Sequence, residues 1–280
     1  MTSNSIPQYL AIGHICADLQ PDGSTRLGGS ALFAAYTAHK LGLRAAIVTA
    51  CADDLDLSPL PAGLQVVRQL APQSTMFENR YGPNGRTQRL HARAPQIDLD
   101  ALPSGWQHTP IIHLAPIIQE VPHTALDLIN TVMGATPQGW LRSVQPDHLV
   151  VTHPPRLLDI PWSARHIAVM SEEDIEGDEQ LVWQLSERID LVVLTRAERG
   201  ATLWQDGTPH DVPAFPASVV DPTGAGDVFA AAFFAALCHD RAPLDAVRWA
   251  CAAAAFSVEG PGIAMLPTAA QVEWRAANGA

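Results

Sequence analysis

The residues of this sequence best suited to carry chemistry lie at positions 221–227, where the chain reads Asp-Pro-Thr-Gly-Ala-Gly-Asp before an apolar, alanine-rich stretch. Glycines at the junction of a loop and a helix leave backbone N–H groups unobstructed, and the start of a helix carries partial positive charge. The segment is therefore expected to bind an anion, and phosphate is the natural candidate.

Asp227 ends this segment and places a carboxylate where the anion is expected. A carboxylate there repels phosphate unless it takes part in the reaction, and a general base must lie close to the reacting phosphorus to accept the proton of an attacking hydroxyl. Asp227 is thus the candidate base. The alternative is that Asp227 only caps the helix that follows, since acidic residues are favoured in a first turn.

Two other phosphate-binding motifs are excluded by residue identity. A Walker A loop requires a Gly-Lys-Ser/Thr step, and Lys40 is the only lysine of the chain. A dinucleotide-binding loop requires glycine or alanine where Phe229 stands, and it follows an early strand. The loop therefore indicates a different class of phosphate site.

The elements that must position this loop alternate between strand and helix. Strands are expected at the short β-type runs 9–12, 45–49, 111–114, 167–170 and 191–195. Helical patterns separate them, which predicts βαβ units and a mostly parallel sheet. The expected fold class is α/β.

A second glycine-rich step lies near the N-terminus. Gly28 and Gly29 precede a helical pattern over 31–41, which stops at Gly42 before the strand at 45–49. Further helices are expected at 178–188, 224–239 and 243–258.

The stretch 74–93 mixes polar and apolar residues without helical period, and residues 81–86 supply turn chemistry in its middle. Two strands folding back around such a turn form a hairpin, and this one is too polar to be core. We expect a small flap.

Composition limits the class of partner. The chain has 280 residues, 47% of them apolar and 16% charged, with a formal charge of −12 and no basic stripe. A nucleic-acid polymer is therefore not expected, and a small ligand is favoured. No repeat or low-complexity linker divides the chain, which predicts a single domain over residues 1–280.

Cysteine usage and hydropathy indicate the compartment. The four cysteines lack a Cys-x-x-Cys pair, and the longest apolar run, 228–238, is about half the ~20 residues that a membrane helix needs. Residues 1–9 contain no secretory signal pattern. We expect a cytoplasmic protein with free thiols and no membrane partner.

The two glycine-rich segments resemble the signatures of one known family. The segment 221–229, Asp-Pro-Thr-Gly-Ala-Gly-Asp-Val-Phe, resembles the C-terminal signature of PfkB carbohydrate kinases. Gly28-Gly29, the alanine-rich helix, Leu41-Gly42 and the strand after it are similar to the family's first signature. The resemblance implies a ribokinase-like fold, with a doubly wound, mostly parallel sheet, helices on both faces and a lid whose strands are expected at about 14–27 and 74–93.

The resemblance also implies roles in the loop. Asp227 is the base for the acceptor hydroxyl, and the backbone of Gly224, Ala225 and Gly226 forms an anion hole for charge developing on the γ-phosphate. Thr223 and Gly226 are expected to contact the phosphates of the nucleotide.

On the acceptor side, the family's acidic residue near the first strand corresponds to Asp18, and Gly28 and Gly29 let the substrate approach the backbone. A plain turn aspartate is the alternative for Asp18. Arg89, in the flap, is expected to read hydroxyls or an anionic group of the acceptor, with a solvated hairpin residue as the alternative. Phe33 stands where many sugar-specific members carry asparagine, which favours an acceptor other than a free pentose and a resemblance to inositol-kinase-like members.

The nucleotide loop of the family is similar to Thr-Arg-Ala-Glu-Arg-Gly at 195–200, with Ala197 in place of a glycine. Thr195 and Gly200 are expected to contact the nucleotide. Gly262 is expected beside the adenine pocket, and together with Asp221 it would hold a monovalent cation such as K⁺.

The family's magnesium-associated motif falls on Ser-Glu-Glu-Asp at 171–174. Glu173 and Asp174 are expected to reach Mg²⁺ through water, because the usual residue pair is replaced. A solvated acidic turn is the alternative.

The expected activity is transfer of the γ-phosphate of ATP, with Mg²⁺, to a hydroxyl of a small sugar, polyol or nucleoside. A non-catalytic member of the same fold that binds a sugar or nucleotide is the alternative. A monomer or homodimer is expected.

Overall fold

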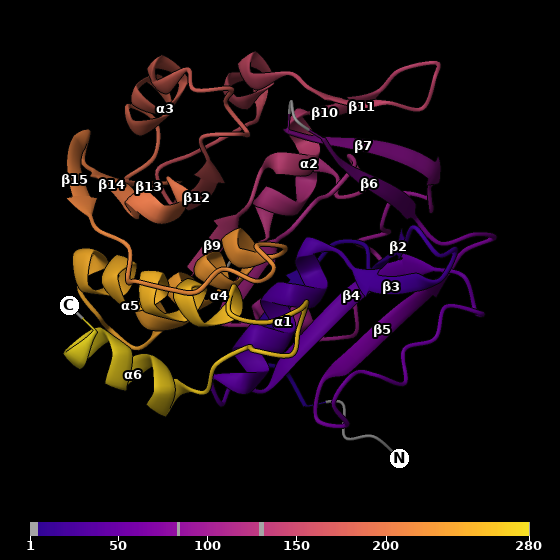
Figure 1. Ribbon diagram of the computed structural model, residues 1–280, viewed down its shortest axis with the longest axis horizontal. Coiled ribbons are helices and arrows are strands. Elements are labelled where there is room, and N and C mark those ends of the chain that lie inside the picture. Colours follow the sequence, from indigo (N-terminus) through magenta and orange to yellow (C-terminus); the bar gives the residue numbers. More distant parts are fainter. Residues whose placement is uncertain (1–4, 83–84, 129–131, 280) are drawn as a thin grey trace.

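The computed structural model describes residues 5–82, 85–128 and 132–279. A nine-stranded sheet forms its centre, in the order β15-β14-β13-β12-β9-β8-β1-β4-β5 (Figure 1). The strands are β1 (Tyr9–Ile12), β4 (Ala45–Cys51), β5 (Gln65–Leu70), β8 (Ile111–Leu114), β9 (Val132–Ala135), β12 (His166–Ser171), β13 (Leu191–Thr195), β14 (Ala201–Gln205) and β15 (Thr208–Val212). All neighbours pair in parallel except β13 with β14 and β14 with β15.

The central strands are buried on both faces, which is why their sequences read as continuous apolar runs. In β1 the side chains of Tyr9 and Ala11 pack into one hydrophobic cluster, and those of Leu10 and Ile12 pack into another. The sheet therefore separates two cores, as the two-residue period of a strand requires.

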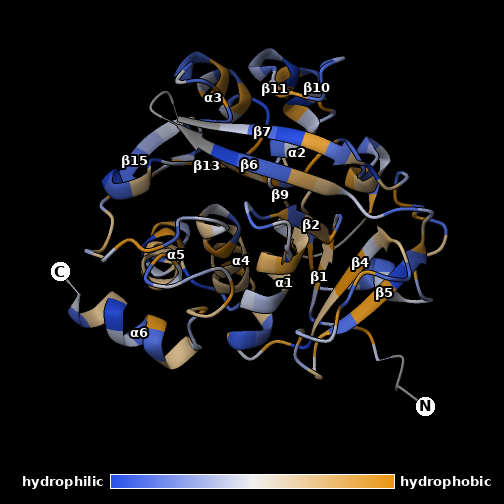
Figure 2. Cartoon of the chain, turned by 45° about the vertical axis from the view of Figure 1, so that its right-hand side comes forward, coloured by the Kyte–Doolittle hydropathy of each residue, from blue (hydrophilic) through white to orange (hydrophobic). Residues whose placement is uncertain are grey.

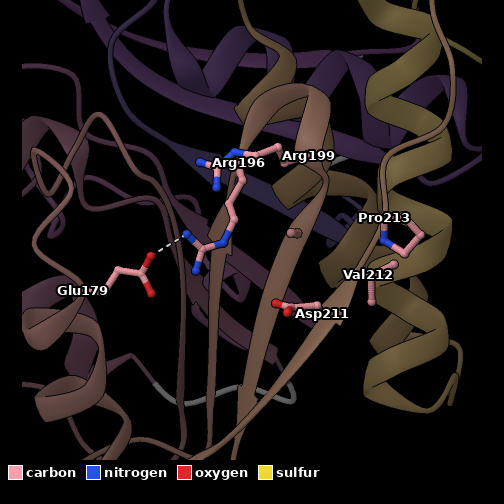
Figure 3. A pocket seen from close by; sticks show the side chains of 7 residues that line it. Glu179, Arg196, Arg199, Asp211, Val212 and Pro213 are labelled. Carbon is pink, nitrogen blue, oxygen red and sulfur yellow. Dashed lines mark hydrogen bonds and ion pairs between the residues drawn. The ribbon is translucent and has the colours of Figure 1, made fainter.

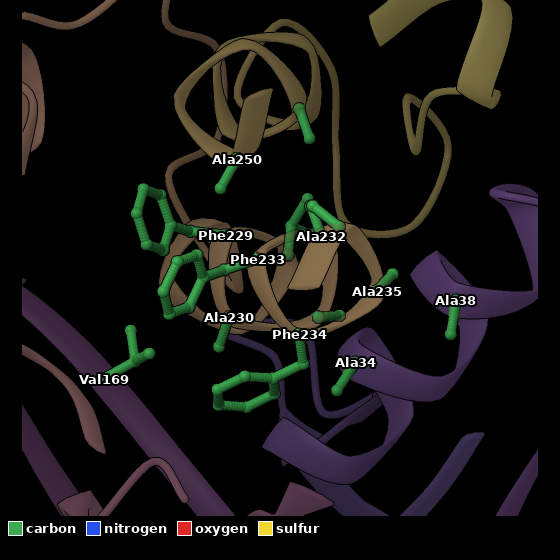
Figure 4. Packing of buried hydrophobic residues seen from close by; sticks show 14 of the residues in the cluster. Ala34, Ala38, Val169, Phe229, Ala230, Ala232, Phe233, Phe234, Ala235 and Ala250 are labelled. Carbon is green, nitrogen blue, oxygen red and sulfur yellow. The ribbon is translucent and has the colours of Figure 1, made fainter. Parts of the chain in front are cut away.

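One face of the sheet is covered by the helices α1 (Ser30–Lys40), α4 (Ala225–Cys238) and α5 (Pro243–Ser257), and α6 (Ala269–Asn278) packs against α5 (Figure 1). Their alanines allow close packing around the rings of Phe233 and Phe234 (Figure 4). Gly134 of β9 lies under Phe234, and a Cβ at Gly134 would fall 2.2 Å from that ring. The expected alanine-rich helices thus form the thicker layer.

The opposite face carries shorter elements. These are α2 (Gln138–Leu141), α3 (Glu179–Ser186) and the 3₁₀ turns η1 (Trp106–His108), η2 (His123–Asp127) and η3 (Pro154–Asp159), with η4 (Ala197–Arg199) after β13. A small hairpin of β10 (Arg142–Val144) and β11 (Val150–Thr152) extends from this layer. Both faces are covered, and the ribokinase-like α/β class predicted from the sequence is confirmed.

A separate four-stranded sheet, the lid, has the order β3-β2-β6-β7. Its strands are β2 (Cys16–Leu19), β3 (Thr25–Gly28), β6 (Met76–Gly82) and β7 (Gly85–Ala92). Both expected lid segments thus contain strands, although residues 83–84 of the expected turn lie outside the described residues. Figure 2 shows hydrophilic and hydrophobic colours mixed along β6 and β7. Within the described ranges, every helix is too short or too polar to cross a membrane.

Candidate active site

The two glycine-rich segments of the sequence, at 28–29 and 221–227, meet at the carboxyl edge of the parallel strands. A Cβ at Gly29, just before α1, would fall 2.3 Å from the carbonyl oxygen of His14, which follows β1. One turn into α1, the Phe33 ring lies against Gly224, which precedes α4. The end of β1 and the starts of α1 and α4 therefore come together, where open α/β sheets place their ligands.

Residues 221–227, which were predicted to bind an anion, are called the anion loop. This loop requires glycine at position 224 and leaves space at Gly226. Gly224 has φ 80° and ψ 0°, and a Cβ there would lie 2.3 Å from the Phe33 ring, so only glycine fits. At Gly226, by contrast, no atom outside its chain neighbours and the local backbone of α4 is found within 4 Å of a Cβ. The first turn of α4 thus has an open face that a ligand can approach.

Asp221 holds the anion loop in shape. Its carboxylate accepts hydrogen bonds from the backbone N–H of Thr223 and of Gly262, both at 3.0 Å, and its Oδ2 lies 3.6 Å from Nη1 of Arg26. Partial burial raises the pKa of Asp221, but these hydrogen bonds and the charge of Arg26 outweigh it, and the pKa is held below its ordinary value. Asp221 is therefore a carboxylate that joins two loops.

Asp227 lies half-buried in the first turn of α4. Burial, and after it the negative charge of Asp227, raises the pKa of Tyr9 well above its usual value. Tyr9 is hydrogen-bonded at 2.7 Å to His113 Nδ1, and burial lowers the pKa of His113 to about 3. Tyr9 and His113, which lie beneath Asp227, are therefore both neutral near pH 7.

Strand register places Asp18 on the face of the lid that is turned to the anion loop. Asp18 pairs with Arg26 on β3 and with Phe77 on β6. Directly paired residues project from the same face of a sheet, and Arg26 on this face reaches Asp221. A Cβ at Gly28 would fall 2.1 Å from the Asp18 carboxylate. Asp18 thus lies beside Gly28, and the role of Asp18, Gly28 and Gly29 in binding the acceptor stays a prediction.

Arg89 lies on the other face of the lid. Leu19 pairs with Glu78, and Glu78 pairs with Arg89, one residue out of phase with Asp18. Arg89 donates a hydrogen bond of 2.5 Å to the carbonyl oxygen of Asp147 in the β10–β11 hairpin. The geometry therefore speaks against the substrate role predicted for Arg89, whose side chain fastens β7 to that hairpin.

A buried carboxylate that sequence reasoning missed joins the loop after β1 to the loop after β8. Glu120 is fully buried and accepts hydrogen bonds from the backbone N–H of His14, Ile117 and Ile118 at 2.7–3.1 Å. The sequence around Glu120 contains no motif that could identify it. Its partners are the backbone of His14, which lies far away along the chain, and the backbone of an irregular loop. Only its charge within an apolar stretch could have signalled a structural role.

His14 forms the second part of this buried junction. Its ring is hydrogen-bonded to the carbonyl oxygen of Pro95 at 2.9 Å and to Oγ1 of Thr75 at 2.8 Å. Burial lowers the pKa of His14, and Arg93 lowers it further against the opposing charge of Glu120. Neutral His14 thus ties the two ends of the β6–β7 hairpin to the end of β1.

In the acidic turn after β12, residues 171–174, one of the carboxylates is buried and hydrogen-bonded within the protein. Asp174 is 7% exposed, and its carboxylate accepts hydrogen bonds from the N–H and hydroxyl of Ser171 and from Gln138, at 2.8–3.0 Å. This bonding speaks against the predicted water-mediated contact of Asp174 with Mg²⁺. Glu173 is exposed. Across the described ranges, no three side chains of His, Cys, Asp or Glu gather into a group that could hold a metal ion.

The predicted nucleotide loop follows the next strand. The backbone N–H of Glu172 donates to the carbonyl oxygen of Thr195 at 3.2 Å, which joins this loop to the acidic turn. Ala197 has φ 49°, so it adopts the left-handed conformation that favours glycine. Gly200 has φ 95°, and a Cβ there would fall 2.0 Å from the carbonyl oxygen of Val212. Packing alone therefore requires Gly200.

A pocket of about 470 Å³ borders this loop (Figure 3). Arg196 crosses it and donates hydrogen bonds to Glu172 at 2.5 Å and to Glu179 at 2.6 Å. The bond to Glu179, against the effect of partial burial and with further help from Glu172, raises the pKa of Arg196. The charge of Arg196 is balanced by these carboxylates, so this arginine is not positioned to neutralise a triphosphate. The lining residues are Glu179, Arg196, Arg199, Ala201, Asp211, Val212 and Pro213.

Residues 162–269, which include the acidic turn, the nucleotide loop and the anion loop, match the model of the pfkB family carbohydrate kinases. The predicted resemblance to PfkB and ribokinase-like kinases is confirmed. The matched segment thus covers the C-terminal signature, while Asp18, Gly28 and Gly29, which are predicted to bind the acceptor, lie outside it.

Individual relatives match the chain either at low identity or over a short segment. A cytidine kinase from Thermococcus kodakarensis is 26% identical over 260 residues, which cover 85% of this chain and 91% of that enzyme. The bifunctional protein HldE of Bradyrhizobium sp. is 43% identical over 81 residues, which are 29% of this chain and only 16% of HldE.

Among solved structures, a pyrophosphate-dependent kinase in the ribokinase family, complexed with a pyrophosphate analog and myo-inositol, superimposes with a TM-score of 0.77. The two chains are 22% identical, and the match covers 95% of this chain and 99% of the other. At this identity the match shows the shared fold.

Proposed function

We propose that the protein is an ATP-dependent kinase that transfers the γ-phosphate to a hydroxyl of a small polyol, sugar or nucleoside. The observation that carries the proposal is the first turn of α4, where Asp227 follows the open backbone at Gly226 and the lid presents Asp18 toward the same loop. An anion site, a half-buried carboxylate and a hydroxyl-binding carboxylate are the parts that phosphoryl transfer to an alcohol requires.

In the proposed reaction, Asp227 accepts the proton of the acceptor hydroxyl while its oxygen attacks the γ-phosphorus. The bond from that phosphorus to the leaving diphosphate breaks, and the pair of electrons departs with the diphosphate oxygen. Backbone N–H groups of residues 224–226 stabilise the negative charge that develops. The lid excludes water, which would otherwise compete as the acceptor.

The acceptor that we propose is a cyclic polyol or a nucleoside. Phe33 fills the space beside Gly224 with an apolar ring, so it offers no amide to a free pentose. Asp18, bounded by Gly28, provides the hydroxyl-binding group. The names of the cytidine kinase and of the structure with myo-inositol support these two acceptor classes.

For the donor, we propose that ATP lies along the loop containing Thr195 and Gly200 and extends toward Thr223, with Gly262 bordering the adenine. Mg²⁺ would be held by phosphate oxygens, with Glu173 contacting it through water, and it would supply positive charge to the phosphates. Each oxygen of Asp221 accepts one N–H bond and keeps a lone pair for a monovalent cation. K⁺ at Asp221 fits this donor set.

The decisive experiment incubates purified protein with Mg·ATP or Mg·pyrophosphate and a panel of cyclic polyols, sugars and nucleosides, with phosphorus NMR of the products. We expect a phosphate monoester with ATP and a polyol or nucleoside. Product with pyrophosphate alone would replace the donor in the proposal. Tight binding of a panel member without any product would favour the non-catalytic binding protein instead.

A further inference from the structure

Arg26 extends from the lid to the anion loop. It lies on β3 opposite Asp18, and its Nη1 is 3.6 Å from Oδ2 of Asp221. Its Cδ also lies 3.8 Å from the place of a Cβ at Gly262. Within the described part of the chain, this is the ion pair that joins the lid to residues 221–227.

The ion pair with Asp221 does not by itself account for Arg26. Both oxygens of Asp221 already accept backbone N–H bonds at 3.0 Å, from Thr223 and from Gly262. The Arg26 side chain is 54% exposed, and a pair that is exposed and long contributes little to stability. The guanidinium is therefore held weakly and is able to change partners.

The charges around the loop call for a cation at this point. A phosphoryl group entering between Asp18 and Asp227 meets carboxylates that repel it. Lys40, the only lysine of the chain, lies at the far end of α1 from Phe33. In the described nucleotide loop, Arg196 and Arg199 are paired with Glu172 or Glu179. Arg89 is on the other face of the lid, beside Asp147.

We propose that Arg26 is a phosphate-binding residue carried by the lid, which exchanges Asp221 for the terminal phosphate of the donor, the group being transferred. The proposal rests on the phosphotransferase function proposed above. An arginine fork suits this task because it donates two parallel hydrogen bonds to phosphate oxygens. Since Arg26 and Asp18 are paired on adjacent strands, the strand pair that binds the acceptor also brings the cation to the phosphate.

The test compares the binding of ATP and of ADP to the wild-type protein, Arg26→Met and Arg26→Lys by titration calorimetry without acceptor. ADP lacks the phosphate that Arg26 is proposed to bind. We expect Arg26→Met to weaken ATP binding about 10- to 10²-fold, as for loss of a charge-assisted hydrogen bond. ADP binding should change by less than about threefold on the same reasoning. Arg26→Lys should lie between, because it keeps the charge and loses the fork.

Arg68→Met is the matched control, because Arg68 on β5 is also an arginine paired with an aspartate, Asp53, at 3.3 Å. It should bind ATP and ADP as the wild type does. Inorganic pyrophosphate is titrated in parallel, so that a donor without a nucleoside is also tested. Thermal melts of each variant show whether the lid and sheet remain folded.

The outcomes separate the two proposals. If the wild type binds ATP or pyrophosphate and Arg26→Met binds it equally well, Arg26 is not a phosphate ligand, whatever the enzyme's activity. Equal weakening of ATP and ADP would also overturn the proposal, because the contact would not involve the terminal phosphate. A wild-type protein that binds neither donor would overturn both this proposal and the kinase function.

Discussion

At the scale of single residues, Asp227 carries the chemical argument, because it follows the open backbone at Gly226 in the first turn of α4. We expect Asp227→Asn to lower turnover by about 10² or more, as for loss of a general base. ATP binding should stay within a few-fold, since the amide occupies the same volume. Steady-state kinetics and calorimetric titration provide the two measurements.

Asp245→Asn provides the control for this variant. Asp245 also lies in the first turn of a helix, α5, so it shares the electrostatic effect of an acidic residue at that position. Its turnover should be close to that of the wild type. If the turnover of both Asp227→Asn and Asp245→Asn stays close to that of the wild type, Asp227 is a helix-capping residue and the proposed mechanism is wrong.

The two glycines of the anion loop predict opposite effects. Gly226→Ala places a methyl group in open space on a helix, where alanine is favoured over glycine by about 1 kcal/mol. We expect its free energy of unfolding to be unchanged or raised while turnover falls, because the methyl group occupies the approach of the phosphate. Gly224→Ala should lose stability by about 1–3 kcal/mol, since φ is 80° and the Phe33 ring is in the way. Urea denaturation and kinetics of both variants check this pair, and full activity in Gly226→Ala would contradict an anion site there.

At the scale of elements, the loop after β13 keeps a glycine-like conformation without glycine. Ala197 is exposed with φ 49°, and this region costs a residue with a Cβ about 1–2 kcal/mol. We expect Ala197→Gly to raise the free energy of unfolding by about 1 kcal/mol on that basis. Ala277→Gly, at an exposed position of α6, should lower it by about 1 kcal/mol. Chemical denaturation measures both, and a loss of stability in Ala197→Gly would contradict the strain assigned to this loop.

Several elements were predictable because their residues are set by local rules. The strands at 9–12, 111–114 and 191–195 have the predicted bounds, since each is an apolar run that is buried on both faces. The helix expected at 224–239 is α4, Ala225–Cys238, because a glycine with positive φ ends the loop before it. Short-range periodicity and glycine chemistry were enough in these cases.

Other features depend on contacts between distant segments, which one sequence does not reveal. The face of the lid on which Arg89 lies depends on the pairing of Leu19 with Glu78, and a shift of one residue reverses it. Asp174 was interpreted by its motif, whereas its bonds to Ser171 and Gln138 depend on the fold. The sequence shows that an acidic residue stands at position 174, but it does not show which groups that carboxylate contacts.

At the scale of the whole molecule, buried neutral histidines link stability to pH. The folded pKa of His113 is about 3, and that of an unfolded histidine is about 6.5. His113 therefore binds a proton more readily in the unfolded chain than in the folded one. Its contribution to the free energy of unfolding is fully present above about pH 6.5 and is lost as the pH falls toward 3. We expect His113 to contribute a loss of about 2 kcal/mol between pH 7 and pH 5. His14, whose pKa is also lowered by burial, should add to the loss in the same direction.

Urea denaturation at pH 7 and pH 5 measures this effect, and NMR titration of the imidazole signals assigns it. His113→Gln should reduce the difference in unfolding free energy between the two pH values, whatever its effect on stability at pH 7. His210→Gln, at an exposed position of β15, is the control and should leave the difference unchanged. An equal pH dependence in wild type and His113→Gln would show that His113 is not a source of acid sensitivity.

The contact between Phe33 and Gly224 has a consequence for evolution and for engineering. The Phe33 ring leaves room only for glycine at position 224, and under the proposed function the same ring borders the acceptor. A substitution of Phe33 that introduced a hydrogen-bonding side chain for a new substrate would therefore remove the support of the loop in the same step. A change of acceptor through Phe33 would then require a compensating change in a neighbour of Gly224.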